Sequence, residues 1–83
     1  MQVRLKFFAS LREALGAEGS LDLPEGSTVA HARDALLARG EPYAQALARG
    51  RALRAARNQT ACSEAEPLAH GDELAFFPPV TGG

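Results

Sequence analysis

The chain has 83 residues, which is enough for one domain and leaves no room for a second. Its formal net charge of -1 gives no reason to expect nucleic acid or an anionic membrane as a partner. No apolar run approaches the ~20 residues that span a bilayer, and the first residues lack the apolar segment of a signal peptide. We therefore expect a cytoplasmic protein, and the single cysteine, Cys62, fits that reducing compartment.

Few side chains offer chemistry of their own. Cys62, His31 and His70 have no neighbours at metal-ligand spacing, so we expect no metal site and interpret Cys62 as a buried or half-buried side chain. No Ser/His/Asp or Cys/His arrangement is apparent, so no nucleophile-base pair is predicted. We interpret a run of arginines among alanines as solvated surface and not as a nucleic-acid site; it comprises residues 49, 51, 54 and 57.

Alternating apolar residues predict a first strand over residues 2–7, with its odd-numbered side chains inward. Ser10 and Glu13 then fit the capping box of a short helix that ends at Gly16. A second alternating segment, residues 20–23, predicts a strand that pairs with the first as in a hairpin.

The main amphipathic helix is predicted to follow Ser27 or Thr28, either of which can cap it, and to end at Gly40. Its buried stripe comprises Val29, Arg33 through its aliphatic stem, Leu36 and Leu37. A third, shorter helix begins with Pro42 in its first turn and ends at Gly50.

Residues 53–57 predict a weak strand, because its alanines pack little and its arginines interrupt it. Asn58-Gln59 and Gly71-Asp72 are predicted turns, and the second leads into a last strand over residues 73–77. This order of elements predicts an α+β fold with a mixed sheet. Helices cover one face of the sheet, and the other face stays open to solvent or to a partner.

Phe8 and Phe77 are large apolar residues that the strand pattern places on the side away from the core. Since their neighbours Phe7 and Phe76 face inward, alternation turns both outward. If the first and last strands are neighbours, Phe8 and Phe77 form one apolar patch on the open face, and such patches mark binding surfaces. The alternative is that Phe8 packs under the first helix and Phe77 only closes the end of the sheet.

A domain over residues 1–77 is followed by an extended tail, residues 78–83, which reaches roughly 20 Å at ~3.3 Å per residue. Pro78 and Pro79 hold the start of the tail extended. Gly82 and Gly83 have no side chains, so a narrow channel can close around the backbone and reach the terminal carboxyl carbon. This pattern favours a partner enzyme that activates a carboxylate, and the alternative is a frayed terminus.

Five segments together resemble the small subunits of molybdopterin synthase, which belong to the ubiquitin-like sulfur carriers. They are residues 5–9 (LKFFA), 58–60 (NQT), 67–68 (PL), 71–77 (GDELAFF) and 78–83 (PPVTGG). The resemblance covers essentially the whole chain and implies the β-grasp fold. It also implies a carrier that binds no cofactor and is not catalytic alone.

By this resemblance, an activating enzyme adenylates the carboxylate of Gly83 with ATP. A sulfur donor of the desulfurase or rhodanese type then converts the adenylate to a thiocarboxylate. The tail inserts into the large subunit of the synthase, within a heterotetramer, and the sulfur passes to cyclic pyranopterin monophosphate to build the dithiolene of molybdopterin. The inserting residues are Pro78, Pro79, Val80, Thr81 and Gly82.

The resemblance also assigns partner contacts. Phe8, Phe77 and Arg12 fall where the family contacts the large subunit, while Ala61 stands where a larger apolar residue is usual. Arg57 replaces an apolar residue, which puts the packing of its strand in question. The alternatives are a related carrier for thiamine or tRNA thiolation, a ubiquitin-like protein modifier, and an interaction module that uses the Phe8/Phe77 patch alone.

Overall fold

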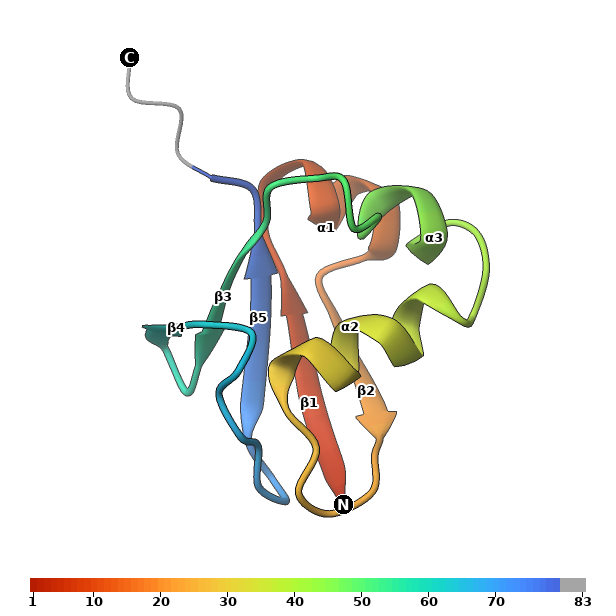
Figure 1. Ribbon diagram of the computed structural model, residues 1–83. Helices are drawn as coiled ribbons and strands as arrows, with labels where there is room; N and C mark the ends of the chain where they lie inside the picture. The colour runs from red at the N-terminus through yellow and green to blue at the C-terminus, as the bar shows by residue number, and fades with distance from the viewer. Residues whose placement is uncertain (80–83) are drawn as a thin grey trace.

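A computed structural model describes residues 1–79, which form a five-stranded sheet with its helices on one face (Figure 1). The strand order is β2-β1-β5-β3-β4. The central pair, β1 and β5, is parallel, and the other pairs are antiparallel, so the predicted mixed α+β sheet is confirmed. The strands are β1 (Gln2–Phe7), β2 (Glu18–Asp22), β3 (Arg54–Arg57), β4 (Thr60–Cys62) and β5 (Glu73–Phe77).

The three helices are α1 (Ala9–Leu15), α2 (Val29–Leu37) and α3 (Tyr43–Ala46). The cap of α2 agrees with the sequence pattern: Thr28 Oγ1 accepts from the His31 N–H, and His31 Nδ1 accepts from the Thr28 N–H. Two helix ends were predicted too late, since α2 ends at Leu37 and α3 at Ala46. After α2, the N–H groups of residues 39 and 40 bond three residues back, as in a tightened last turn.

The capping box predicted for α1 is wrong. The N-cap is Phe8, whose side chain makes no capping hydrogen bond. Phe8 is still extended, with φ -125 and ψ 160, and its N–H donates to the Phe76 carbonyl at 3.3 Å. Because the strand ladder continues through Phe8, the helix begins immediately after it, and Ser10 already lies in the first turn. Gly16 ends α1 at φ 88, as predicted.

Strand β4 was missed in the sequence. Its three residues are too few to show a period, and two of them are exposed. The turn before it was predicted, and Asn58 and Gln59 form its two-residue loop with φ 49 and 70. Positive φ at both positions matches the right-handed twist of a hairpin, so the turn folds β4 back onto β3.

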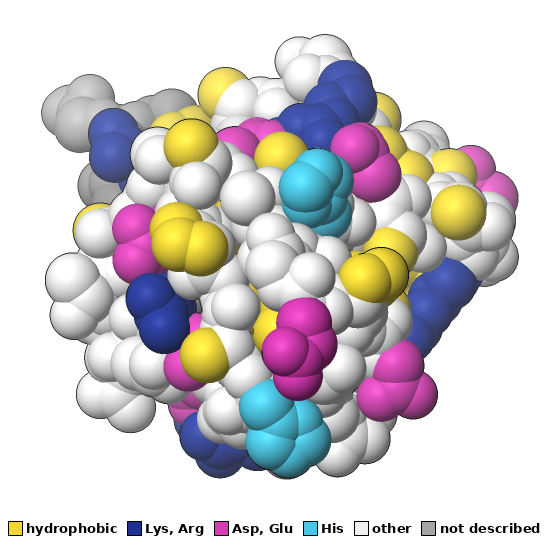
Figure 2. Space-filling model, turned by 60° about the horizontal axis from the view of Figure 1, so that its bottom comes forward, with side chains coloured by type: hydrophobic (Ala, Val, Ile, Leu, Met, Phe, Trp, Pro, Cys, Tyr) yellow, Lys and Arg dark blue, Asp and Glu magenta, His cyan; other side chains and the backbone are white. Residues whose placement is uncertain are grey.

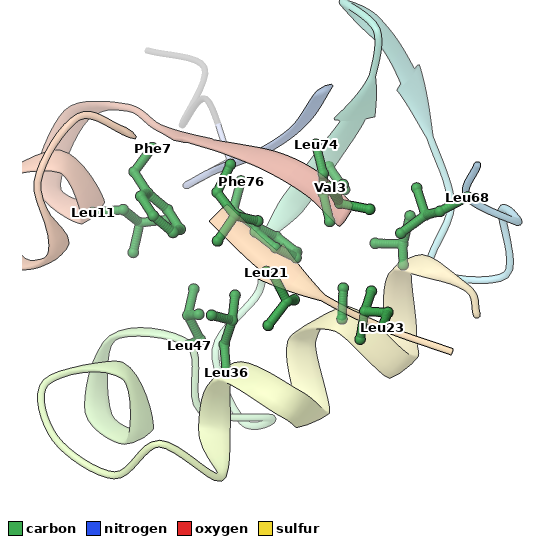
Figure 3. Packing of buried hydrophobic residues seen from close by; sticks show 14 of the residues in the cluster. Val3, Phe7, Leu11, Leu21, Leu23, Leu36, Leu47, Leu68, Leu74 and Phe76 are labelled. Carbon is green, nitrogen blue, oxygen red and sulfur yellow. The ribbon is translucent and has the colours of Figure 1, made fainter. Parts of the chain in front are cut away.

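The hydrophobic core lies between the sheet and the helices (Figure 3). The inward residues of β1 are buried as alternation predicts, and Phe76 and Leu74 of β5 meet them from the adjacent strand. The helices contribute Leu11, Val29 and Leu36, and Leu47 is buried immediately after α3. At the end where the loops gather, hydrophobic side chains are scattered among acidic, basic and histidine side chains (Figure 2).

Candidate functional site

The open face of the sheet carries the predicted aromatic pair. Phe8 continues β1 beside β5 by its hydrogen bond to Phe76, and its side chain is 48% exposed. Phe77 is half-buried at the end of β5. The exposure of Phe8 excludes the alternative in which it packs under α1. Both phenylalanines therefore lie where the last described residues, Pro78 and Pro79, leave the sheet.

A row of small side chains lies beside this pair. Lys6 is paired with Ala75, Ala75 with Ala56, and Ala56 with Ala61 across four adjacent strands. Directly paired residues project on the same face, so the three alanines form a low shelf next to the phenylalanines. Ala61 is exposed at the edge of the shelf. We call Phe8, Phe77 and the three alanines the open-face patch.

Arginines flank the open-face patch on two sides. Arg54 is paired in register with Phe77, so its side chain projects on the same face. Arg12 is exposed on α1, one turn after Phe8, whose carbonyl accepts its backbone N–H at 3.4 Å. The family resemblance singled out Arg12, whereas Arg54 was interpreted as solvated surface. The pairing of Arg54 with Phe77 would have placed Arg54 on the open face, but the register of β3 and β5 does not follow from the sequence alone.

Hydrogen bonds around Asp72 fix the start of β5. Arg57 Nε donates to Asp72 Oδ2 at 2.7 Å, and Asn58 Nδ2 donates to Asp72 Oδ1 at 3.0 Å. The Asn58 Oδ1 also accepts the Glu73 N–H at 3.0 Å. Burial alone would raise the pKa of Asp72, but the hydrogen bonds from Asn58, the Ala69 N–H and Arg57 outweigh it and hold this pKa below its usual value.

Arg57 therefore does not disturb its strand. A second ion pair, from Arg57 to Glu66 at 3.1 Å, holds the other side of its guanidinium. The departure from the family pattern is thus accommodated by two carboxylates on the segment that leads into β5.

A second cluster holds the segment that leads into β3. Arg33 is only 3% exposed as a residue, and its guanidinium donates to the carbonyls of Leu47, Ala48 and Arg51, and to Glu64. The sequence predicted that Arg33 is buried through its aliphatic stem, whereas the structure buries the charged end too. These bonds satisfy carbonyls of the segment that follows α3, which stops before Gly50.

Residues 5–83 match a family model whose description is ThiS family. The chain belongs to the ThiS family.

Two curated relatives of this ThiS family member are both called molybdopterin synthase sulfur carrier subunit. The Escherichia coli protein (strain K12) is 43% identical over 81 residues, which cover 98% of this chain and 99% of the relative. The Haemophilus influenzae protein is 40% identical over 77 residues, which cover 93% and 94%. These relatives confirm the resemblance to the small subunit of molybdopterin synthase.

Solved structures confirm the β-grasp fold. SAMP1 from Haloferax volcanii has a TM-score of 0.78 at 34% identity, and each chain is covered completely. The putative molybdopterin converting factor subunit 1 from Pyrococcus furiosus has a TM-score of 0.78 at 27% identity, with 96% and 99% covered. A chain in the complex of subunits 1 and 2 of the molybdopterin-converting factor from Helicobacter pylori shares the fold, with a TM-score of 0.68 at 21% identity.

The predicted tail lies mostly outside the described residues. Pro78 and Pro79 are half-buried where they follow β5, while Val80, Thr81, Gly82 and Gly83 are not among residues 1–79. Within residues 1–79, no helix is long and apolar enough to cross a membrane, and no three His, Cys, Asp or Glu side chains gather as a metal site would require.

Cys62 of this ThiS family member lies half-buried against the core, as predicted. Burial and the nearby charge of Glu66 raise the pKa of its thiol. A raised pKa favours the neutral thiol over the thiolate.

Proposed function

We propose that this chain is the sulfur carrier subunit of a molybdopterin synthase and that the domain over residues 1–77 presents the tail, residues 78–83, to other enzymes. The observation that carries the proposal is the position of Phe77. It ends a strand that is hydrogen-bonded on both sides, and it lies in the open-face patch at the point where the tail begins. Identity of 43% to a sulfur carrier subunit over nearly the whole chain supports the same function.

The chemistry takes place at the carboxylate of Gly83, with all catalytic groups supplied by partners. An oxygen of the carboxylate attacks the α-phosphorus of ATP on an activating enzyme and displaces pyrophosphate. The outer sulfur of a persulfide on a donor of the desulfurase or rhodanese type then attacks the acyl carbon and displaces AMP. A thiol reductant cleaves the resulting acyl disulfide, which leaves a thiocarboxylate on the carrier and a disulfide on the donor side. That sulfur attacks cyclic pyranopterin monophosphate in the large subunit, and water then cleaves the resulting thioester, so the sulfur stays on the pterin and the carrier leaves with its carboxylate restored. The absence of side chains at Gly82 and Gly83 suits a narrow channel in each partner.

The large subunit is the partner that we assign to the open-face patch, in a heterotetramer in the cytoplasm. Phe8 and Phe77 supply apolar anchors, Arg12 lies one helical turn away, and Ala61 leaves space at the edge of the patch. The occurrence of the same fold in the complex of subunits 1 and 2 from Helicobacter pylori supports this partner class.

Mass spectrometry of the intact chain tests the carrier function. The chain is incubated with ATP, a sulfur donor and the activating enzyme of the same organism, and we expect a mass gain that corresponds to exchange of oxygen for sulfur. A variant that lacks Gly83 serves as the control and should gain nothing. A full-length chain that never gains this mass would contradict the proposal.

A second candidate is a protein modifier that forms isopeptide bonds to lysines. The likeness to SAMP1, whose full name is small archaeal modifier protein 1, favours it at 34% identity. Lysines linked to Gly83 in digests of cell extract would support this function. A carrier for thiamine or tRNA thiolation shares the carboxylate chemistry, and a pull-down that identifies the tightest partner separates it from the first proposal.

A further inference from the structure

The side chain of Arg54 has no evident role in holding the described fold together. It lies at the start of β3, is exposed, and is paired in register with Phe77. Together with Pro79 it lines a groove to which Ala55, Cys62 and Phe76 also contribute. Arg54 is therefore next to both the last residue of β5 and the first part of the tail.

The guanidinium of Arg54 has no partner within residues 1–79. None of the ion pairs formed there includes it, and its side chain donates no hydrogen bond to a described residue. Arg57, on the same strand, is held by two carboxylates, and Arg49 is paired with Asp34 and Glu64. Within the described part of the chain, Arg49 and Arg57 are thus held by internal carboxylates, whereas Arg54 is not.

The positive charge of Arg54 is not neutralised by the described charged side chains around it, at the place where Pro78 and Pro79 leave β5. On the open face, Lys6 and Glu73 neutralise each other across 3.3 Å. Glu64 also lines the groove, but its carboxylate is already engaged by Arg33 and Arg49. Phe77 and Phe8 make the surroundings apolar, and an ion pair covered by such surroundings is much stronger than one in water.

We propose that Arg54 is a docking residue that binds a carboxylate on the large subunit, at the rim of the channel that receives the tail. This inference rests on the proposed function. A planar guanidinium binds a carboxylate through two parallel hydrogen bonds, which fixes orientation as well as adding attraction. With Phe77 as the apolar anchor beside it, the pair of contacts would set the angle at which the tail enters the partner. Arg54 thereby helps to select a partner that carries an acidic side chain at that place.

Binding to the large subunit of the same organism tests the proposal, measured by calorimetry at low and at raised salt. We expect Arg54→Ala to weaken binding about tenfold at low salt, Arg54→Glu to weaken it more, and Arg54→Lys to restore part of the loss. The dependence of binding on salt should be smaller in Arg54→Ala than in the unchanged chain. Arg39→Ala is the matched control, since Arg39 is exposed near the end of α2, over the Tyr43 ring and away from the open face.

Two further measurements keep the outcomes separate. Thermal unfolding should give the same midpoint for all Arg54 variants, because nothing within residues 1–79 depends on this side chain. Formation of the Gly83 thiocarboxylate is followed by mass in the same preparations. If the thiocarboxylate forms and Arg54→Glu binds the large subunit as tightly as the unchanged chain, the docking role is overturned while the carrier function stands. If no thiocarboxylate forms, the carrier function itself has failed.

Discussion

The guanidinium of Arg33 donates to Glu64 Oε2 across 2.7 Å, although the two residues are 31 positions apart in the chain. This contact joins α2 to the segment between β4 and β5. The same guanidinium holds three carbonyls of the segment that leads into β3. One buried side chain thus ties together the two connections that flank the groove beside the tail.

Replacing Arg33 should therefore destabilise the fold strongly. We expect Arg33→Leu to lower the free energy of unfolding by about 3 kcal/mol, because buried carbonyls and Glu64 lose their donor. Urea unfolding followed by circular dichroism measures the change. Arg39→Ala, an exposed arginine near the same helix, should cost much less. Equal losses for the two variants would show that the Arg33 contacts carry no special weight.

Stability should fall on the acid side of the pH scale. Burial would raise the pKa of Glu64, but hydrogen bonds from Arg49 and Arg33 outweigh it, so this pKa, like that of Asp72, lies below its usual value. The unfolded chain then binds more protons in this range, so stability rises with pH. The contribution is complete above the ordinary carboxyl pKa of about 4 and is lost as pH falls through the lower folded values.

Denaturant unfolding at a series of pH values measures this loss. Asp72→Asn removes one of the two carboxylates and should flatten the acid limb of the stability curve. A variant that keeps the full slope below pH ~4 would show that Asp72 does not contribute to it.

The hairpin turn offers a stabilising change. Gln59 has φ 70, a conformation that glycine adopts without steric cost. Gln59→Gly should raise the free energy of unfolding by about 0.5–1 kcal/mol. Asn58→Ala should act in the opposite direction by about 1–3 kcal/mol, because Glu73 and Asp72 lose the Asn58 amide. Thermal midpoints of both variants measure the effects, and a loss of stability in Gln59→Gly would be the contrary result.

Phe7 and Phe8 should respond differently to the same substitution. Phe7 is buried in the core, and Phe7→Ala should cost about 3–5 kcal/mol of folding stability. Phe8→Ala should change stability by about 1 kcal/mol or less and weaken binding to the large subunit instead. Unfolding and binding are measured on the same preparations. A Phe8→Ala protein that binds normally would remove Phe8 from the interface.

Phe77→Ala should likewise weaken binding to the large subunit more than it weakens folding, since Phe77 is only half-buried. The comparison uses the ratio of the two free-energy changes. If folding and binding fall in proportion, Phe77 belongs to the core rather than to the contact surface.

The parts of the fold that follow from local pattern were predictable. The alternation in β1 and β5 gave the buried residues and the outward direction of Phe8 and Phe77, because strand periodicity depends only on neighbouring residues. The predicted position of the α1 cap failed because a long-range hydrogen bond from Phe8 to Phe76 overrides the local preference of Ser10. The roles of Arg33 and Arg54 could not be predicted for the same reason, because they depend on which distant segments lie beside these residues.

The central place of β5 in the sheet has a mechanical consequence. β5 is hydrogen-bonded to β1 on one side and to β3 on the other, along nearly its full length. A force applied through Pro78 would act along the strand and load both ladders in shear, so several hydrogen bonds would have to break together. A partner that pulls on the tail during entry or release would move the whole domain rather than unravel it.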